Sequence, residues 1–462
     1  MRLRLQQNVA WALAEVIASG LILFFLYRIV VKDLGVEALG IWSMVMATTS
    51  LGRLADIGTA AGLGRFVAIA RAQNDDRKAM LIAETAILTN LVLYLGIAAV
   101  LWAPAHYGLS LMASGISLEK ARELLPYTLL SFVLMSVTAA TTGALVGQQR
   151  SDQRSMVTIA SLFVQFTVAL LFVPHYGLPG LAWAQTAQYL SIVCASWTLF
   201  LNNHSGTWTF RVPLRWRFDV LKELIGFGVK LQAVSIVSFL FEPTVKFLMS
   251  AFGGLETLGF YEMAQRLVLQ VRQLIAMPNQ ALVPGFAHLK ECEPEKIEPL
   301  YHKAMALTVA TGLPLLAGVA VASPVISAIW IGHVDHLFVL FTLLLAAGWF
   351  ANLLAAPAYL LGVALGYLRW NFIGTMVTTV GAALLSCIFG FLGGKFGVAV
   401  PAMAMLGVGS VSTMVMNCRA LGIRLFPARS IFSDLHEEIR ARIKKAFFNR
   451  CNGRRAGEDI RS

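Results

Sequence analysis

The stretch GVEALGIWSM, residues 35–44, recurs 219 residues later as GLETLGFYEM, residues 254–263. Each copy stands between two long apolar segments, a position typical of a tight turn that joins two helices. A weaker repeat pairs YGL at residues 176–178 with FGV at residues 396–398, at nearly the same spacing. Self-similarity at a fixed spacing indicates a chain of two duplicated halves, whereas the alternative is a composition that tight turns share by chance.

Apolar segments follow one another on both sides of these turns, from Val9 to Leu421. The 462 residues are 57% hydrophobic and only 13% charged, whereas about a quarter of a soluble domain is charged. A segment of roughly 20 apolar residues is long enough to cross a bilayer. We therefore predict an all-α polytopic membrane protein of about twelve transmembrane helices in two parallel six-helix lobes, with spans near residues 9–31, 38–62, 79–102, 123–147, 155–173, 178–201, 226–249, 257–283, 303–331, 336–361, 369–392 and 397–421.

Lysine and arginine gather in the loops after the even-numbered spans, for example at Arg71, Arg150 and Arg215. Cytoplasmic loops carry this excess, so we expect both termini in the cytoplasm. Two lobes of six spans each then enter the membrane in the same orientation, as in transporters that rock parallel repeats around a midplane site. The expected parts are a lobe at 1–201, a cytoplasmic linker at 202–222, a lobe at 223–422, and a basic amphipathic tail at 423–462 that lies on anionic headgroups or is simply solvated.

Other function classes find little support in the composition. The net charge of +12 does not indicate a nucleic-acid reader, because no basic stretch is interleaved with aromatic residues on a soluble domain. The cysteines and histidines are scattered, so we expect neither a disulfide framework nor a metal. No phosphate loop or nucleophile with its base is recognisable, so we expect no cofactor, no catalytic residue and no enzymatic activity.

Short motifs in both halves point to a family. LGIWS (residues 39–43), DIG (56–58) and GRFV (64–67), with LGFYEMAQRL (258–267) and PGF (284–286), resemble the polysaccharide-biosynthesis, Wzx-like flippases of the multidrug/oligosaccharidyl-lipid/polysaccharide exporter superfamily. The resemblance implies a two-lobed, alternating-access transporter of the bacterial inner membrane. Its substrate would be an undecaprenyl-diphosphate-linked oligosaccharide, an O-antigen or exopolysaccharide repeat unit. Membrane lipids, a glycan polymerase and export machinery are the candidate partners.

Two arginines at membrane depth are the first candidates for binding this substrate. Arg53 and Arg272 are related by the 219-residue spacing. An ionisable group in the bilayer costs about 2.5–3.5 kcal/mol on insertion scales, so it should face a cavity or a partner. Guanidinium groups bind phosphate oxygens bidentately, which suits a clamp for the diphosphate. The alternatives are that Arg53 pairs with Asp56 for packing, and that Arg272 extends to the membrane surface.

A second pair of cations, Arg28 and Lys246, lies nearer the outer face and is offered as a later phosphate ligand, with Arg266 as a further candidate. Lys246 could instead pair with Glu242, four residues earlier on the same helix face. A carboxyl in low dielectric favours its protonated form. Three acidic residues could therefore carry a coupling proton or serve in ion pairs: Glu15, Asp56 and Glu242.

Three rival functions remain at this stage. A cation-coupled multidrug exporter of the same superfamily would need an acidic cavity, whereas here cations outnumber carboxylates at depth. A membrane glycan polymerase or glycosyltransferase would need a sizeable outer catalytic loop, and only residues 103–123 form a predicted outer loop of any length. A non-transporting assembly partner is the third alternative.

Overall fold

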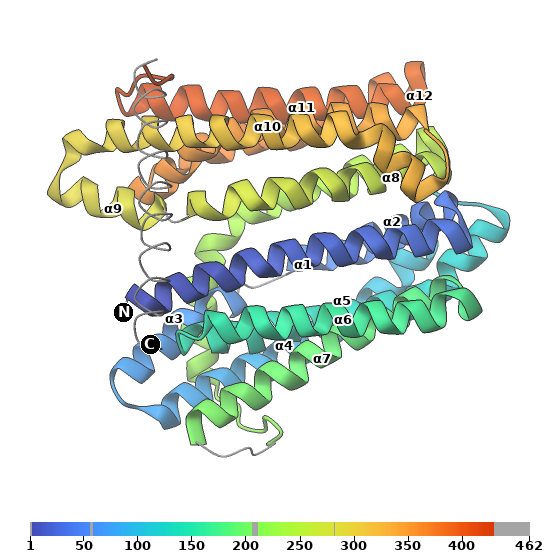
Figure 1. The fold of residues 1–462 in the computed structure, drawn as a ribbon. Helices are drawn as coiled ribbons and strands as arrows, with labels where there is room; N and C mark the ends of the chain where they lie inside the picture. The colour runs from blue at the N-terminus through green and yellow to red at the C-terminus, as the bar shows by residue number, and fades with distance from the viewer. Residues whose placement is uncertain (1, 56–58, 206–210, 281, 429–462) are drawn as a thin grey trace, which may run out of the picture.

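The described part of the protein, a computed structural model covering residues 2–55, 59–205, 211–280 and 282–428, is built from helices and contains no strand (Figure 1). The first helices are α1 (Arg2–Leu34), α2 (Val36–Ser50), the short 3-10 helix η1 (Leu51–Ala55), α3 (Thr59–Ala72), α4 (Asp76–Leu109), α5 (Gly115–Gly147), α6 (Ser151–Tyr176) and α7 (Leu178–Ser205). The others are α8 (Phe218–Gln280), α9 (Leu282–Cys292), the 3-10 helix η2 (Pro294–Lys296), α10 (Ile297–Ile331), α11 (His336–Leu365) and α12 (Leu368–Ala420).

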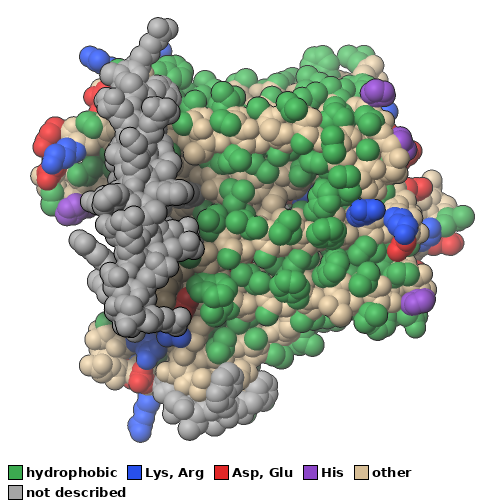
Figure 2. Space-filling view, viewed as in Figure 1, with side chains coloured by type: hydrophobic (Ala, Val, Ile, Leu, Met, Phe, Trp, Pro, Cys, Tyr) green, Lys and Arg blue, Asp and Glu red, His purple; other side chains and the backbone are tan. Residues whose placement is uncertain are grey.

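The long helices lie side by side along one direction, and α1 runs from the end that carries the N-terminus to the opposite end (Figure 1). We call the first the amino-terminal end and the second the Gly35 end. Within the described residues, eight helical stretches are long and apolar enough to cross a membrane. Side chains in the middle of the face in view are mainly hydrophobic, while charged ones gather at the two ends (Figure 2). Val321 in α10 is 81% exposed, which suits a lipid-facing surface rather than water.

Several predicted spans differ from the observed helices. The span expected at residues 38–62 is interrupted, because α2 gives way to η1 at Leu51. The loop expected at residues 103–123 is mostly helical: α4 continues to Leu109 and α5 begins at Gly115. The cytoplasmic loop expected after residue 283 contains α9. The amphipathic tail lies outside the described residues beyond residue 428.

Two pairs of glycines with positive φ turn the chain at equivalent points of the two halves. Gly35 has φ 83° and ψ 169°, and Gly254 has φ 81° and ψ 171°. This region of backbone space is open essentially only to glycine. Gly177 (φ 66°, ψ −136°) and Gly394 (φ 54°, ψ −131°) form the second pair. The predicted match of Gly177 with Gly397 is therefore wrong by three residues.

The spacing in the last hairpin is 217 residues, and a second pair of contacts agrees with it. A Cβ on Gly180 would meet the backbone of Phe172, and a Cβ on Gly397 would meet the backbone of Phe389. Both partners of each contact differ by 217. The repeat is thus real at backbone level, but two residues are missing from the second half between its first and last turns.

The halves touch each other closely at the Gly35 end. Gly40 lies against the backbone of Leu255, and Gly259 lies against the backbone of Val36, so that a Cβ at either glycine would collide with a carbonyl. Each residue of one contact matches a residue of the other at the 219 spacing. The contact between α2 and α8 is therefore symmetrical, and it depends on the absence of a side chain at two positions.

The buried core follows the same organisation. One large cluster joins α1 and α2 to α8, α10 and α11, including Met44 and Tyr261. A second cluster lies in the first half and includes Leu63 and Val67 from α3. Leu224, from the start of α8, is buried in this second cluster. The helix that opens the second half therefore begins by packing on the first half.

Candidate functional site

A cavity of about 360 Å³ lies between α8, α11 and the two parts of α12, before and after its kink at Gly394. Its size falls in the range of about 300–1,000 Å³ usual for small-molecule sites. Small residues leave the space open, among them Ala355, Ala356 and Gly374. The polar side chains that line it carry hydroxyls, an amide, an indole and one guanidinium: Ser238, Thr375, Thr378, Thr379, Ser410, Thr413, Tyr359, Asn352, Trp349 and Arg272.

Arg272 is the charged residue of this lining, which contains no aspartate or glutamate. Its Nη2 donates a hydrogen bond of 2.9 Å to Oδ1 of Asn352, and its Cζ lies 4.6 Å from the ring centroid of Trp349. Nε of Arg272 and Nε1 of Trp349 are both buried and have no hydrogen-bond partner. A buried donor without a partner costs about 1–3 kcal/mol. The cavity wall thus holds a cation with no acidic partner among the lining residues.

Arg53 is exposed and lies in η1. Its Nη2 is 2.6 Å from Sδ of Met135 in α5, and its Cζ lies 5.4 Å from the ring centroid of Phe239 in α8. The predicted ion pair with Asp56 falls on a residue outside the described ones.

The two arginines of the predicted clamp have different neighbours, and no described contact joins them. They flank the same short stretch of α8, however, because Arg53 lies over Phe239 while Ser238 and Phe241 line the cavity of Arg272. Each arginine follows its turn glycine by 18 residues, which is about 27 Å along a helix. Both therefore lie toward the amino-terminal end of the molecule.

A buried ion cluster, which we call the Glu262 cluster, lies nearer the Gly35 end. Glu262 is 1% exposed. Nζ of Lys246 is 2.7 Å from Oε2 of Glu262 and 2.7 Å from Oε1 of Glu242, and Nε of Arg266 is 2.7 Å from Oε1 of Glu262. The pairing of Lys246 with Glu242 expected from their spacing is thus present. Two cations and two carboxylates leave the cluster neutral.

The first half completes this cluster through two hydroxyls. Ser43 Oγ donates to Glu262 Oε2 over 2.7 Å, and Tyr27 OH donates to Glu262 Oε1 over 3.5 Å. Ser43 and Glu262 are themselves equivalent in the repeat, 219 residues apart, and Tyr27 is the equivalent of Lys246. Glu262 thus takes hydrogen bonds across the contact between the halves. The sequence signal that marks Glu262 is its place inside the repeated motif, at the position of Ser43 in the first copy.

The remaining predicted site residues are more dispersed. Arg28 is exposed on α1. Lys246, proposed with it as a phosphate ligand, is buried with its ammonium held by two carboxylates. Glu15 is 3.7 Å from Nη2 of Arg154 in α6, and its other oxygen is buried without a partner. Glu84, which is not among the predicted residues, is fully buried and accepts a hydrogen bond from the backbone of Arg215, shortly before α8.

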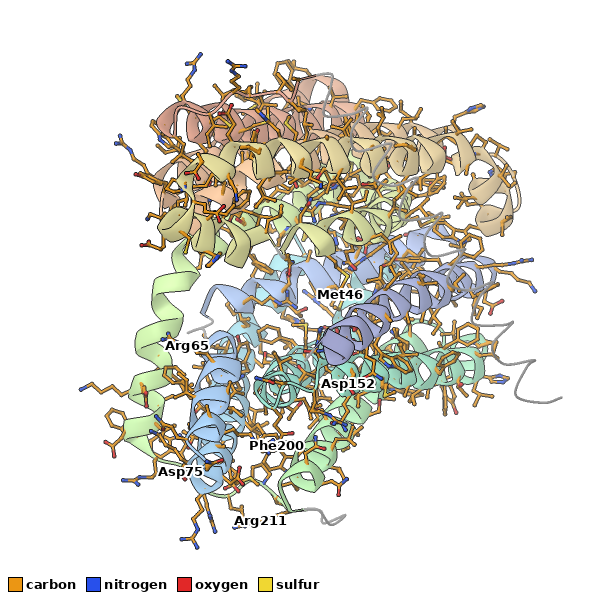
Figure 3. The ribbon with its side chains drawn as sticks, turned by 60° about the vertical axis from the view of Figure 1, so that its left-hand side comes forward. Met46, Arg65, Asp75, Asp152, Phe200 and Arg211 are labelled. Carbon is orange, nitrogen blue, oxygen red and sulfur yellow. The ribbon has the colours of Figure 1, made fainter. Side chains whose placement is uncertain are left out.

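Figure 3 turns the amino-terminal end toward the viewer and shows where Arg211, which precedes α8, lies relative to the first half. Arg65 of α3 and Asp75, which precedes α4, lie in the first half, and Arg211 lies below them. Met46 of α2 lies above them, toward the helices of the second half. Trp197 donates from Nε1 to the backbone carbonyl of Arg211 over 2.6 Å. Arg211 and Arg215, which precede α8, are therefore both hydrogen-bonded to helices of the first half. Among the described residues, no group of His, Cys, Asp and Glu could hold a metal ion.

Comparisons with known proteins agree with this architecture. The profile of a family described as polysaccharide biosynthesis protein matches residues 29–334. An inward-facing multidrug resistance MATE family transporter of the MOP superfamily is 17% identical, with a TM-score of 0.72 over 87% of this chain and 94% of that one. The lipid II flippase MurJ, in an inward closed conformation, is 14% identical, with a TM-score of 0.66 over 92% and 90% of the two chains.

A MOP superfamily transporter from Pyrococcus furiosus, described by the reverse polarity of its binding pocket, is 17% identical, with a TM-score of 0.61 over 90% and 95% of the two chains. A comparison of the sequence with curated proteins gives no match. At these identities the structural likenesses establish the fold, which is that of a MATE-like, all-α, multi-pass membrane protein.

Proposed function

The chain belongs to the polysaccharide biosynthesis protein family and has the fold of MOP-superfamily transporters, and we propose that it carries a polyprenyl-diphosphate-linked oligosaccharide across the bacterial cytoplasmic membrane. This family consists of transporters and not of enzymes. The proposed substrate is a repeat unit of an O-antigen or exopolysaccharide. It would cross by alternating access, with its polyprenyl tail in lipid and its diphosphate and glycan inside the protein.

The observation that carries this proposal is the unpaired cation of the cavity. Arg272 has no carboxylate partner among the lining residues, and a buried charge without a counter-charge is costly unless a ligand compensates it. A diphosphate offers several acceptor oxygens to a guanidinium. Arg53, on the other side of the Ser238–Phe241 stretch, would supply the second half of the clamp as the halves move.

The proposed topology has twelve spans in two lobes, 1–201 and 223–422, joined by the linker at 202–222. The matching turns at Gly35 and Gly254 support it, because they begin equivalent helices in each half. The cationic loops favour both termini in the cytoplasm. The amino-terminal end would then face the cytoplasm and the Gly35 end the periplasm, so Arg53 and Arg272 would meet the substrate first.

In this proposal the outward opening separates the halves at the Gly35 end. The contacts of Gly40 and Gly259, with the hydrogen bond of Ser43 to Glu262, hold this end closed. Lys246 is released as a later phosphate ligand, beside Arg28, once its cluster opens. Glu15, Asp56 and Glu242 stay candidates for a coupling proton, and the buried, unpartnered oxygen of Glu15 favours that residue.

The rival functions fit the cavity less well. A carrier of cationic drugs needs carboxylates near its substrate, and the lining residues include none. A glycan polymerase needs room for an outer catalytic domain, and the predicted loop at 103–123 shrinks to residues 110–114 between α4 and α5.

Charge reversal tests the clamp. In a host that lacks the chain, Arg272→Glu and Arg53→Glu should fail to restore glycan export and should let lipid-linked oligosaccharide accumulate on the inner leaflet, because each places an anion beside the diphosphate. Arg369→Glu is the matched control, since Arg369 is exposed and stacks on Trp370 away from the cavity. Full export by the Arg272→Glu protein, at wild-type membrane level, would rule the clamp out.

A further inference from the structure

The segment that leads into α8 alternates arginines with large apolar side chains. It reads RVPLRWRF at residues 211–218, with arginines at 211, 215 and 217 and apolar residues at 212, 214, 216 and 218. Residues 211–217 contain no helix or turn, and successive side chains of an extended chain point to opposite sides. The pattern therefore separates a basic side from an apolar side. We call residues 211–218 the amphipathic segment.

The apolar side of the amphipathic segment is exposed. Leu214 is exposed to 77%, and Val212, Trp216 and Phe218 are exposed as well. Apolar area in contact with water is unfavourable, and a contiguous exposed apolar patch indicates a surface that meets a membrane or another protein. In a chain that crosses the membrane several times, the bilayer is the nearest apolar phase.

Three hydrogen bonds hold the amphipathic segment on the first half, where Arg211 lies at the margin of the helices (Figure 3). The backbone carbonyl of Arg211 and the backbone amide of Arg215 bond to side chains of α7 and α4. Nε1 of Trp216 donates to Oγ1 of Thr89 in α4 over 3.1 Å. Since the two arginines are held by their backbone, their guanidinium groups are left for another partner.

Trp216 lies where α4 changes from a buried to a lipid-facing helix. Residues 82–87 of α4 are buried, whereas Val92, three residues after Thr89 on the same helix face, is 69% exposed. Val92 belongs to a helix long and apolar enough to cross a membrane, so this face meets lipid. Tryptophan is enriched at the boundary between membrane and water. The bond of Trp216 to Thr89 therefore sets the amphipathic segment at the edge of the bilayer.

The basic side of the amphipathic segment carries an excess of positive charge. Arg217 lies 3.4 Å from Asp219, and both side chains are exposed. Arg211 and Arg215 are exposed too, and neither forms an ion pair within the described part of the chain. Basic side chains close to a bilayer are attracted to anionic headgroups, and a guanidinium binds phosphate oxygens through two hydrogen bonds.

We propose that the amphipathic segment is a binding site for anionic phospholipids of the bilayer. Arg211 and Arg215 bind the headgroup phosphate, and the apolar side chains enter the outer part of the acyl layer. The site is separate from the cavity of Arg272 and does not involve the transported substrate. Because Leu224 of α8 also packs on the first half, the bound lipid holds the start of α8 at the membrane surface together with that half.

The test is the quenching of Trp216 by lipids that carry bromine on their acyl chains. The full chain is reconstituted in phosphatidylcholine bilayers that contain a fixed share of brominated phosphatidylglycerol or, in a parallel sample, of brominated phosphatidylcholine. The fluorescence of Trp216 is the difference between wild type and Trp216→Phe. Brominated phosphatidylglycerol should quench it more strongly, because the anionic lipid gathers beside the two arginines, and high salt should reduce this preference.

Two variants separate a specific site from general contact with lipid, each measured against the same variant with Trp216→Phe. Arg211→Gln combined with Arg215→Gln should lower the preference for phosphatidylglycerol by up to roughly 5-fold for each arginine. Arg369→Gln, which changes an exposed arginine at the start of α12, should leave the preference unchanged.

Two results would overturn the proposal. Equal quenching by the two brominated lipids in wild type would show contact with the bilayer without selection of anionic lipid. Absence of quenching by either lipid would place Trp216 in water or under a protein partner. Neither result depends on transport, so the proposed function would stand after both.

Discussion

At the scale of single residues, the Glu262 cluster and the cavity of Arg272 hold their charged side chains in different ways. Glu262 and Lys246 are almost fully buried, and each has two groups of opposite charge at 2.7 Å. Glu262 also accepts a hydrogen bond of 2.7 Å from Ser43. Arg272 instead has an amide, an aromatic ring and an open cavity. The first arrangement is complete without a ligand, and the second becomes complete with one. We therefore assign structural closure to the Glu262 cluster and substrate binding to Arg272.

The structural role of the cluster predicts a stability effect. Glu262→Gln leaves Arg266 and one side of Lys246 without a counter-charge, and breaking a buried ion pair by removing one partner costs about 3–5 kcal/mol. The melting temperature of the purified protein should fall clearly, and the double variant Glu262→Met with Lys246→Met should recover much of the loss. The control is Asp219→Asn, because the Arg217–Asp219 pair is exposed. A melting temperature unchanged by Glu262→Gln contradicts the assignment.

At the scale of helices, glycines set where the chain turns and how closely the halves approach. Gly35 and Gly254 share a backbone conformation that other residues rarely adopt. Gly40 and Gly259 lie inside helices without a positive φ, but each lies against a backbone carbonyl of the other half. The first pair makes the hairpins, and the second pair allows the closed contact between α2 and α8.

The second pair predicts a shift in conformation. In Gly40→Ala or Gly259→Ala, the new methyl group collides with a backbone carbonyl of the other half when the halves are in contact. The helix itself is not weakened, because alanine stabilises a helix by about 0.5–1 kcal/mol relative to glycine. Single cysteines placed near the Gly35 end should therefore react faster with a membrane-impermeant thiol reagent added from outside. Gly96→Ala is the control, because nothing lies near its Cβ position. Unchanged labelling in both interface variants would show that this contact does not close the outer end.

The sequence predicts the elements better than it predicts the site. The apolar helices, the repeat and the turn at Gly254 can be predicted, because the length of an apolar segment and the spacing of glycines are read directly from the sequence. The motifs YGL and FGV pair Gly177 with Gly397, three residues after its structural equivalent Gly394, because a three-residue motif is too short to reveal a changed spacing. The sequence does not predict the helical extensions of α4 and α5 into residues 103–123, because the polar residues there favour a loop in isolation, whereas packing retains a helix.

The site depends on contacts between distant segments. Arg272 and Arg53 could be chosen for their depth and symmetry, but Trp349, Asn352 and the threonines of α12 have no local motif that marks them. The sequence leaves the role of Lys246 open between a phosphate and Glu242. The position of Glu262 across the α8 turn shows that the single ammonium of Lys246 is held by two carboxylates. Chain folding, rather than composition, brings these groups together.

At the scale of the whole molecule, the two regions lie at different depths. The Glu262 cluster is eight residues from the turn glycine, about 12 Å along the helix, whereas Arg272 is 18 residues from it, about 27 Å. In the proposed orientation a neutral, closed region faces the periplasm and a cationic, open cavity faces the cytoplasm. Entry of an anionic headgroup from the cytoplasm and its later release at the Gly35 end follow from that order.

Transport by the purified protein tests the central claim most directly. The protein is reconstituted in liposomes with the host's lipid-linked oligosaccharide carrying a fluorescent label on its glycan, and a membrane-impermeant quencher reports how fast the glycan changes leaflet. We predict rapid movement with wild type, movement close to the protein-free rate with Arg272→Glu, and wild-type movement with Arg369→Glu. Equal rates for wild type and protein-free liposomes would contradict the account.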